Sequence, residues 1–308
     1  MTLAHKSALT GGVIALVSIA GVAGATFGVT TSGSGDGAAE VSCPGGMTRL
    51  GHPFDENMSV FPFDPAIRIS NDYTVAEDFF LVEDIDTGAH AGTHLDVPAH
   101  FIAGGRSLDE FTAEEFVWPA YKIDVRGMTF TDNFVEVTDI LAYEEEHGEI
   151  EPGSLVILQT GAEEFFGLDG PGDSRGFAPP DPDRPELDDQ ALNIDDLFDF
   201  VNPGFSGAAV QWLFDERDID GVGADAYGPD AATDDLFDAT FTTLLNDGVA
   251  LVAIANLDSV SVKNDVIMAP TVALTDGSGF TTDPIACHGA PGDDDSSDDD
   301  SSDDDSDD

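Results

Sequence analysis

Basic residues are scarce in this 308-residue sequence. Ten lysines and arginines stand against 62 aspartates and glutamates, for a formal net charge of −52, and the only lysines are Lys6, Lys122 and Lys263. Nucleic acids and anionic lipid surfaces are bound through basic patches, so this balance argues against both as partners. At molar salt the Debye length is about 3 Å and charge repulsion is largely screened. An acidic, lysine-poor surface is therefore what a halophilic protein would carry.

Common zinc motifs are also missing. There is no His-Glu-x-x-His and no Cys-x-x-Cys, which argues against zincin and zinc-ribbon sites. The two cysteines, Cys43 and Cys287, bracket the central part of the chain almost end to end. Chain ends often lie close together, and an exported protein meets an oxidising milieu. Two interpretations remain open: a disulfide that joins the two ends, or two unpaired thiols.

An apolar stretch at residues 11–29 is flanked by one lysine, Lys6, and by acidic residues from Asp36 onward, which orients it with the N terminus inside. It is either a signal peptide cleaved after Ala25 or an uncleaved membrane anchor, since about 20 apolar residues span the hydrocarbon core. Both interpretations place the bulk of the chain outside the cytoplasm, extracellular or at the cell surface.

The remaining sequence divides into three parts: a linker at 30–46, one mixed α/β domain at 47–286 and an Asp/Ser-rich tail at 287–308. The tail has no apolar run, so we expect it to be disordered and His288 to be solvated. Apolar, β-branched runs predict strands at Tyr121–Val125, Leu155–Thr160, Gly221–Ala224, Ala250–Ile254 and Val266–Leu274. Helical periodicity predicts one helix at Val137–His147 and another that begins after Ser206.

Three of the seven histidines fall within eleven residues, close to an aspartate. The four residues are His90, His94, Asp96 and His100. Gly92 and Pro98 disfavour a helix, and on an extended chain these even-numbered side chains point to one face. Buried imidazoles and carboxylates each need a partner, and one divalent metal satisfies all four. The alternative is a set of solvated surface histidines near an acid.

The motif His-x-Gly-Thr-His-x-Asp-x-Pro-x-His, from His90 to His100, resembles the signature of the cyclase-like metal-dependent hydrolases, which include kynurenine formamidases and isatin hydrolases. Weaker similarities follow in the same order, at Pro152–Gly161, Asn202–Ser206, Val222–Asp230 and Asn256–Asp258. The resemblance covers about 47–286. It implies a single mixed α/β domain of the cyclase-like, swivelling β/β/α type, and a homodimer or larger homo-oligomer with sites near the interface.

The resemblance further implies that His90, His94 and Asp96 bind a first divalent metal, zinc or manganese. His100 would bind a second metal or act as a general acid/base. A bound metal lowers the pKa of its water toward neutrality, so a metal-bound hydroxide would attack the carbonyl of an arylformamide, a lactam or a cyclic imide. His100 would then hand a proton to the departing nitrogen.

Two residues that complete the site in formamidase-like relatives are missing. The additional histidine is expected at Thr240 or Phe241, and the additional acid or glutamine at Val252 or Ala253. The absence does not depend on alignment, because no histidine lies between positions 147 and 288 and no glutamate follows position 216. A single-metal site is therefore expected. Two functions stay open: a metal-dependent amidohydrolase of small molecules, and a catalytically degenerate metal-binding surface protein of the same fold.

Overall fold

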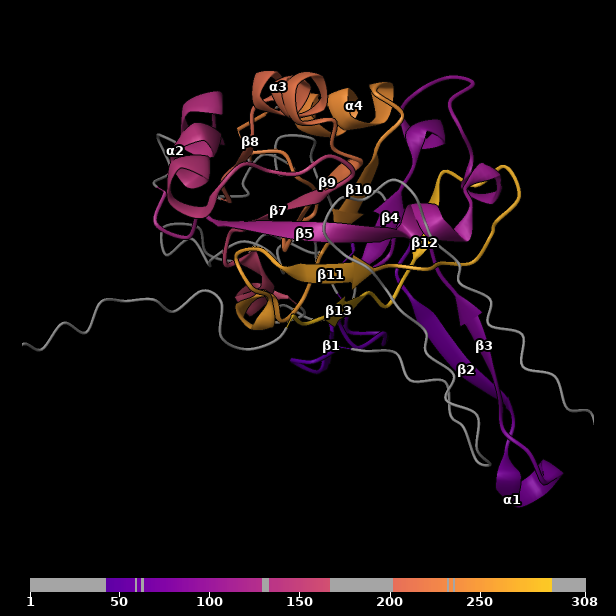
Figure 1. The fold of residues 1–308 in the computed structure, drawn as a ribbon. Helices are drawn as coiled ribbons and strands as arrows, with labels where there is room; N and C mark the ends of the chain where they lie inside the picture. Colours follow the sequence, from indigo (N-terminus) through magenta and orange to yellow (C-terminus); the bar gives the residue numbers. More distant parts are fainter. Residues whose placement is uncertain are drawn as a thin grey trace, which may run out of the picture.

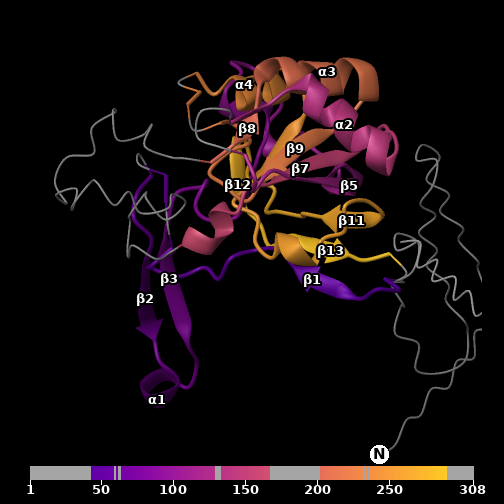
Figure 2. The same cartoon turned by 90° about the vertical axis from the view of Figure 1, so that its left-hand side faces the viewer.

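The computed structural model describes residues 43–58, 60–61, 64–128, 133–166, 202–231, 233–234 and 236–289. A mixed sheet lies at its centre (Figure 1), and its strands are β1 (Met47–Arg49), β4 (His94–Asp96), β5 (Val117–Asp124), β7 (Leu155–Gln159), β9 (Gly221–Ala224), β10 (Val249–Val252), β11 (Asp265–Met268), β12 (Gly279–Thr281) and β13 (Ile285–Cys287). Their order is β1-β13-β11-β5-β7-β9-β10-β4-β12. The helices α2 (Val137–His147), α3 (Gly207–Arg217) and α4 (Asp238–Leu245) cover one face of the sheet (Figure 2).

Smaller elements complete the fold. The short parallel pair β6 (Phe134–Val135) and β8 (Gly204–Phe205) lies outside the central sheet. Single 3₁₀ turns are η1 (Pro98–His100), η2 (Leu108–Glu110), η3 (Ala113–Phe116), η4 (Ala162–Phe165) and η6 (Leu257–Ser259).

The middle of the sheet is parallel and buried on both faces. Strands β5, β7, β9 and β10 pair in parallel in that order. Within β7 the side chains alternate: Val156 and Leu158 pack under the helices, whereas Leu155 and Ile157 pack into a second core on the other face, with Trp118. Burial on both faces explains why these strands are continuous apolar runs that the sequence reveals. The expected mixed α/β domain is confirmed.

Both predicted helices are confirmed. Helix α2 has the predicted bounds, and α3 begins after Ser206, whose Oγ accepts a hydrogen bond from the N–H of Ala209 at 3.1 Å. The last predicted strand, Val266–Leu274, is too long, because β11 ends at Met268. Pro270 has no N–H to donate to a strand ladder, and the residues after it are mostly exposed.

A hairpin of β2 (Arg68–Tyr73) and β3 (Val82–Asp86), with α1 (Val75–Asp78) at its tip, extends away from the sheet (Figure 1). Phe79 is 94% exposed at this tip, beside the exposed Val75 and Phe80. A two-stranded hairpin is marginally stable on its own. These apolar side chains are exposed in the single chain, and the homodimer stays a prediction.

The two ends of the domain are joined. Cys43 and Cys287 form a disulfide, which confirms the hypothesis that they link the chain ends, and β1 pairs with β13 beside it. The expectation that His288 is solvated is wrong: its Nδ1 lies 2.9 Å from the buried Asp265 carboxylate and its Nε2 lies 2.9 Å from Thr48 Oγ1. Pairing of the two ends draws this histidine against the sheet.

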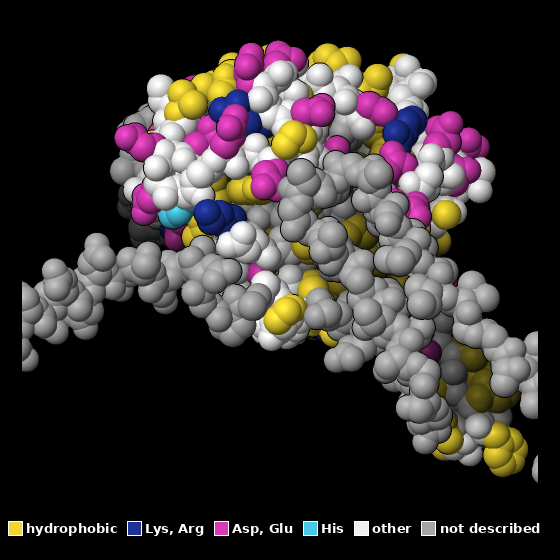
Figure 3. All heavy atoms as spheres, in the orientation of Figure 1, with side chains coloured by type: hydrophobic (Ala, Val, Ile, Leu, Met, Phe, Trp, Pro, Cys, Tyr) yellow, Lys and Arg dark blue, Asp and Glu magenta, His cyan; other side chains and the backbone are white. Residues whose placement is uncertain are grey.

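The predicted signal or anchor segment at 11–29 lies outside the described residues, as do most of the linker and all but the first three residues of the tail. Export therefore stays a prediction. Among the residues that the structure describes, no helix is long and apolar enough to cross a membrane. Figure 3 shows Asp and Glu side chains spread over the exposed face of the helical layer, in keeping with the net charge of −52.

Candidate metal centre

The central strand of the candidate site is β4, which lies between β10 and β12 and is antiparallel to both. His94 lies opposite Val252 on one side and Thr281 on the other, so its backbone is fixed from both neighbours. His94 and Asp96 are two residues apart on this strand, and their side chains therefore point to the same face. The predicted extended geometry is confirmed for these two residues.

His90 and His100 reach the same place through turns. Gly92 has φ +63°, which favours glycine, and a Cβ there would lie 2.3 Å from Met58 Sδ, so a larger residue would force Met58 to move. His100 closes η1, a 3₁₀ turn with Pro98 in its first position. The extended interpretation is therefore wrong for His100, because proline is well suited to the first position of a helical turn.

The four predicted residues do come together. His90 Nδ1 lies 2.6 Å from Asp96 Oδ1, and His94 Nε2 lies 3.4 Å from the same oxygen. The rings of His90 and His100 stack with centroids 4.0 Å apart. One ligand atom each from His90, Asp96 and His100 fall within 4.8 Å of one another. The carboxylate of Asp96 is thus the common neighbour of three imidazoles.

Charge at this site is concentrated on Asp96. Burial alone would raise the pKa of Asp96, but the charge of His94 and hydrogen bonds from His90 and His94 bring that pKa well below its usual range. Burial would lower the pKa of His94, and the attraction of Asp96 raises it instead. The pKa of His100 is lowered, chiefly by burial and further by the two other imidazoles, which favours its neutral form. The buried Asp96 anion is therefore stabilised by cationic charge, which the His94 imidazolium supplies here and a divalent ion could supply instead.

The donor set fits a divalent metal. His94 Nδ1 lies 2.7 Å from the carbonyl oxygen of Gly92, which can only accept, so Nδ1 carries the hydrogen. In the neutral ring the lone pair is then on Nε2, the atom that faces Asp96. Metal-binding histidines commonly have their second nitrogen held in this way. Three imidazoles and one carboxylate are ligands that suit zinc or manganese.

Comparison with known proteins agrees with this geometry. The sequence pattern of a family described as a putative cyclase matches residues 48–231. The chain belongs to this family. Isatin hydrolase from Roseibium aggregatum is 27% identical to the cyclase-family chain over 219 residues, which cover 68% of this chain and 75% of that protein.

Solved structures show the same fold as this chain. Isatin hydrolase A from Labrenzia aggregata, bound to benzyl benzoate, gives a TM-score of 0.65 at 23% identity over 78% of this chain and 92% of that one. A potential metal-dependent hydrolase with cyclase activity gives 0.54 at 19% identity, over 78% and 96% of the two chains. The expected cyclase-like fold is confirmed, and the relatives support a metal-dependent hydrolase with a metal cofactor.

The residues expected at the two missing ligand positions lie on β10 and its end and on α4. Val252 is opposite His94 across the β10–β4 pair, and the carbonyl of the next residue, Ala253, accepts a hydrogen bond from Thr93 Oγ1. Thr240 and Phe241 lie on α4, which packs against η1. In the described ranges, only the cluster around Asp96 brings three or more His, Cys, Asp or Glu ligand atoms close enough for an ion. The single-metal site stays a prediction.

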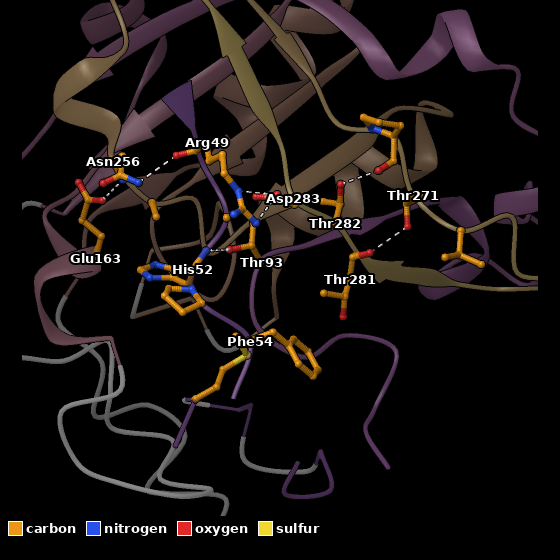
Figure 4. A pocket seen from close by; sticks show the side chains of 16 residues that line it. Arg49, His52, Phe54, Thr93, Glu163, Asn256, Thr271, Thr281, Thr282 and Asp283 are labelled. Carbon is orange, nitrogen blue, oxygen red and sulfur yellow. Dashed lines mark hydrogen bonds and ion pairs between the residues drawn. The ribbon is translucent and has the colours of Figure 1, made fainter. Parts of the chain in front are cut away.

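Two features of the candidate site were not predicted. Ser278 Oγ lies 2.8 Å from His90 Nε2, just before β12. In addition, the loop after β1 and the end of β12 border a pocket of about 800 Å³ (Figure 4). Thr93 and Thr281 line it from the side of the metal centre, and none of the four candidate ligands does. Burial lowers the pKa of His52 in this pocket to about 4, which keeps the ring neutral. Both features depend on β12, which has three residues and lies far along the chain from the ligands. So short a strand leaves little pattern in the sequence from which either feature could be predicted.

Asp225 and Asp230, two buried carboxylates after β9, have structural partners. Asp225 accepts hydrogen bonds from Thr160 and from the N–H of Gly161, and so fixes the turn after β7. Asp230 accepts two from Thr240, one from its N–H at 2.9 Å and one from its hydroxyl. Burial raises the pKa of Asp230 to about 6. Thr240, one of the two positions at which the absent histidine was expected, is thus paired with Asp230.

Replacing Asp230 with asparagine is expected to stabilise the protein at neutral pH. The pKa of Asp230 is about 6 in the fold against an ordinary 3.8. Protonated Asp230 therefore adds to the free energy of unfolding, fully below pH 3.8. This contribution is lost as the pH rises through 6, and the loss is of the order of 3 kcal/mol. The gain of Asp230→Asn over wild type, measured by denaturant unfolding, should grow between pH 4 and pH 7.5. A gain that is the same at both pH values would contradict this assignment.

Proposed function

We propose that this protein is a metal-dependent amidohydrolase of small aromatic amides, and that a lactam is its substrate class. The observation that carries the proposal is the convergence of three imidazoles on the ionised, buried carboxylate of Asp96. His90, His94 and Asp96 hold the divalent ion, zinc or manganese, and His100 serves the proton transfer. When bound, the ion supplies an activated water and polarises the substrate carbonyl.

The residues of the chain divide the remaining tasks. Asp96 keeps its charge through contact with His90 and His94, and Gly92 fixes the orientation of the His94 ring. His100 is more exposed than the other members of the cluster and stacks on His90. In its neutral form, His100 would accept a proton from the attacking water and then donate it to the departing nitrogen.

Aromatic rings beside His100 support an aromatic substrate. Phe101 packs edge-on against His100 with centroids 4.8 Å apart, and Phe237 lies 6.4 Å from Phe101. Phe61 continues the series, 6.3 Å from Phe237 and 5.8 Å from Tyr227. A flat substrate ring would gain edge-to-face contacts along this series. Isatin, the substrate that names the relatives, is an aromatic lactam.

A second candidate function rests on the absent ligands. Thr240, Phe241, Val252 and Ala253 offer neither imidazole nor carboxylate. A chain that kept the first ligand set and lost turnover would bind a metal as a surface protein without hydrolysing anything.

The two functions are separated by one experiment on the full chain in molar salt. Metal content is measured by mass spectrometry, and hydrolysis of isatin and of an N-formyl arylamine is followed by absorbance. The hydrolase predicts one equivalent of zinc or manganese and opening of the lactam. Bound metal without turnover of either compound would favour the surface protein, and protein that binds no metal would overturn both.

A further inference from the structure

The hydroxyl of Ser278 is placed against the imidazole of His90. Ser278 Oγ lies 2.8 Å from His90 Nε2, and within the described residues this is the one hydrogen bond that the hydroxyl makes. Ser278 directly precedes β12, in which Gly279 lies opposite Asp96 and Thr281 lies opposite His94. The backbone that carries Ser278 is therefore held in register with the strand that carries two of the ligands.

The other nitrogen of the same ring faces the carboxylate. His90 Nδ1 lies 2.6 Å from Asp96 Oδ1, and an ionised carboxylate can only accept. Either Nδ1 carries the hydrogen, or its lone pair and the carboxylate share a cation. In a neutral ring that donates to Asp96, the hydrogen is on Nδ1. In a neutral ring whose Nδ1 lone pair faces a shared cation, the hydrogen is on Nε2.

We propose that Ser278 is a positioning residue for His90, because a hydroxyl can pair with Nε2 in both states. Without the ion, the Ser278 hydroxyl donates to Nε2 while Nδ1–H donates to Asp96. With the ion bound, Nε2–H would donate to Ser278 Oγ and the lone pair of Nδ1 would be available to hold the metal. The inference rests on the proposed metal-dependent function and adds a residue that orients one ligand.

The space around the ring supports this role. A Cβ on Gly279 would lie 2.7 Å from His90 Cε1 and 2.4 Å from the backbone oxygen of Leu95, so the ring is packed directly against the start of β12. His100 stacks on the ring, with centroids 4.0 Å apart. Rotation about the long axis of the side chain is then set by the two hydrogen bonds, to Asp96 and to Ser278.

The test measures zinc affinity on the full chain, by competition of Zn²⁺ with a chromogenic chelator. Ser278→Ala is expected to raise the Zn²⁺ dissociation constant about 10- to 100-fold, the usual effect of removing a group that holds a ligand. Ser278→Thr keeps the hydroxyl and should bind nearly as tightly as wild type. Ser259→Ala is the matched control, because its hydroxyl donates to Asn256 O at 2.7 Å in η6, away from the ligands.

Two results would overturn the proposal. One is the wrong order of Zn²⁺ affinities among the variants, with alanine as tight as wild type or threonine as weak as alanine. The other comes from ¹⁵N NMR of the zinc-loaded wild type: the hydrogen of His90 is expected on Nε2, and its presence on Nδ1 would contradict the assignment. A wild-type chain that binds neither Zn²⁺ nor Mn²⁺ would overturn the proposed function as well, so failures of the two are distinguishable.

Discussion

Replacing His94 with alanine is expected to abolish stoichiometric metal binding and to lower amide hydrolysis by about 10³-fold or more. A bound ion contributes several kcal/mol to transition-state stabilisation, and each 1.36 kcal/mol is a factor of ten in rate. His94 is the most buried imidazole of the cluster, and its Nδ1 is held by a hydrogen bond to the carbonyl oxygen of Gly92. Metal content and the rate of lactam opening, measured on the same preparation, check the prediction.

The His94→Ala variant also removes a partner of the buried Asp96, so its fold needs a separate test. His94→Gln retains most of the side-chain volume and an amide that can donate to Asp96, and it should lose the metal to the same degree. His147→Ala is the matched control: this histidine ends α2, away from the cluster, and its loss should change neither metal content nor rate. Full activity in either His94 variant would refute the metal centre.

The sequence reveals this centre because its four residues lie close together in the chain. His94 and Asp96 follow the two-residue period of a strand, which is a local rule. His90 and His100 were assigned correctly to the cluster, but the backbone that brings them there is a glycine turn and a proline-led 3₁₀ turn. The residue types therefore predicted which side chains come together better than they predicted the backbone conformation at His90 and His100.

What the sequence conceals is the part of the site that comes from distant segments. Strands β1, β12 and β13 have three residues each, too few for a recognisable alternation, and the position of Ser278 depends on the pairing of β12 with β4. The hairpin of β2 and β3 was missed for another reason. Its residues are largely exposed and polar, such as Ser70, Asn71 and Asp84, so they carry no buried face.

Removal of the disulfide is expected to lower the free energy of unfolding by about 3–5 kcal/mol. Cys43 and Cys287 are 244 residues apart, and closing so long a loop restricts the unfolded chain strongly. Domains are stable by only about 5–15 kcal/mol, so the loss is a large share of the total. The measurement is denaturant unfolding of Cys43→Ser, Cys287→Ser and the double variant in molar salt.

The structure also predicts where this loss acts. β1 is an edge strand that pairs only with β13, and the metal centre lies toward the opposite edge of the sheet, at β4 and β12. The double variant, while folded, should therefore bind Zn²⁺ as tightly as wild type, but it should unfold at a lower denaturant concentration. Either single variant already breaks the bridge, so each should be as unstable as the double variant, and reduced wild type should match them. Two reactive thiols in wild-type protein under denaturing, non-reducing conditions would show that the bridge does not form. The prediction that the chain is exported would then lose the support that a disulfide gives it.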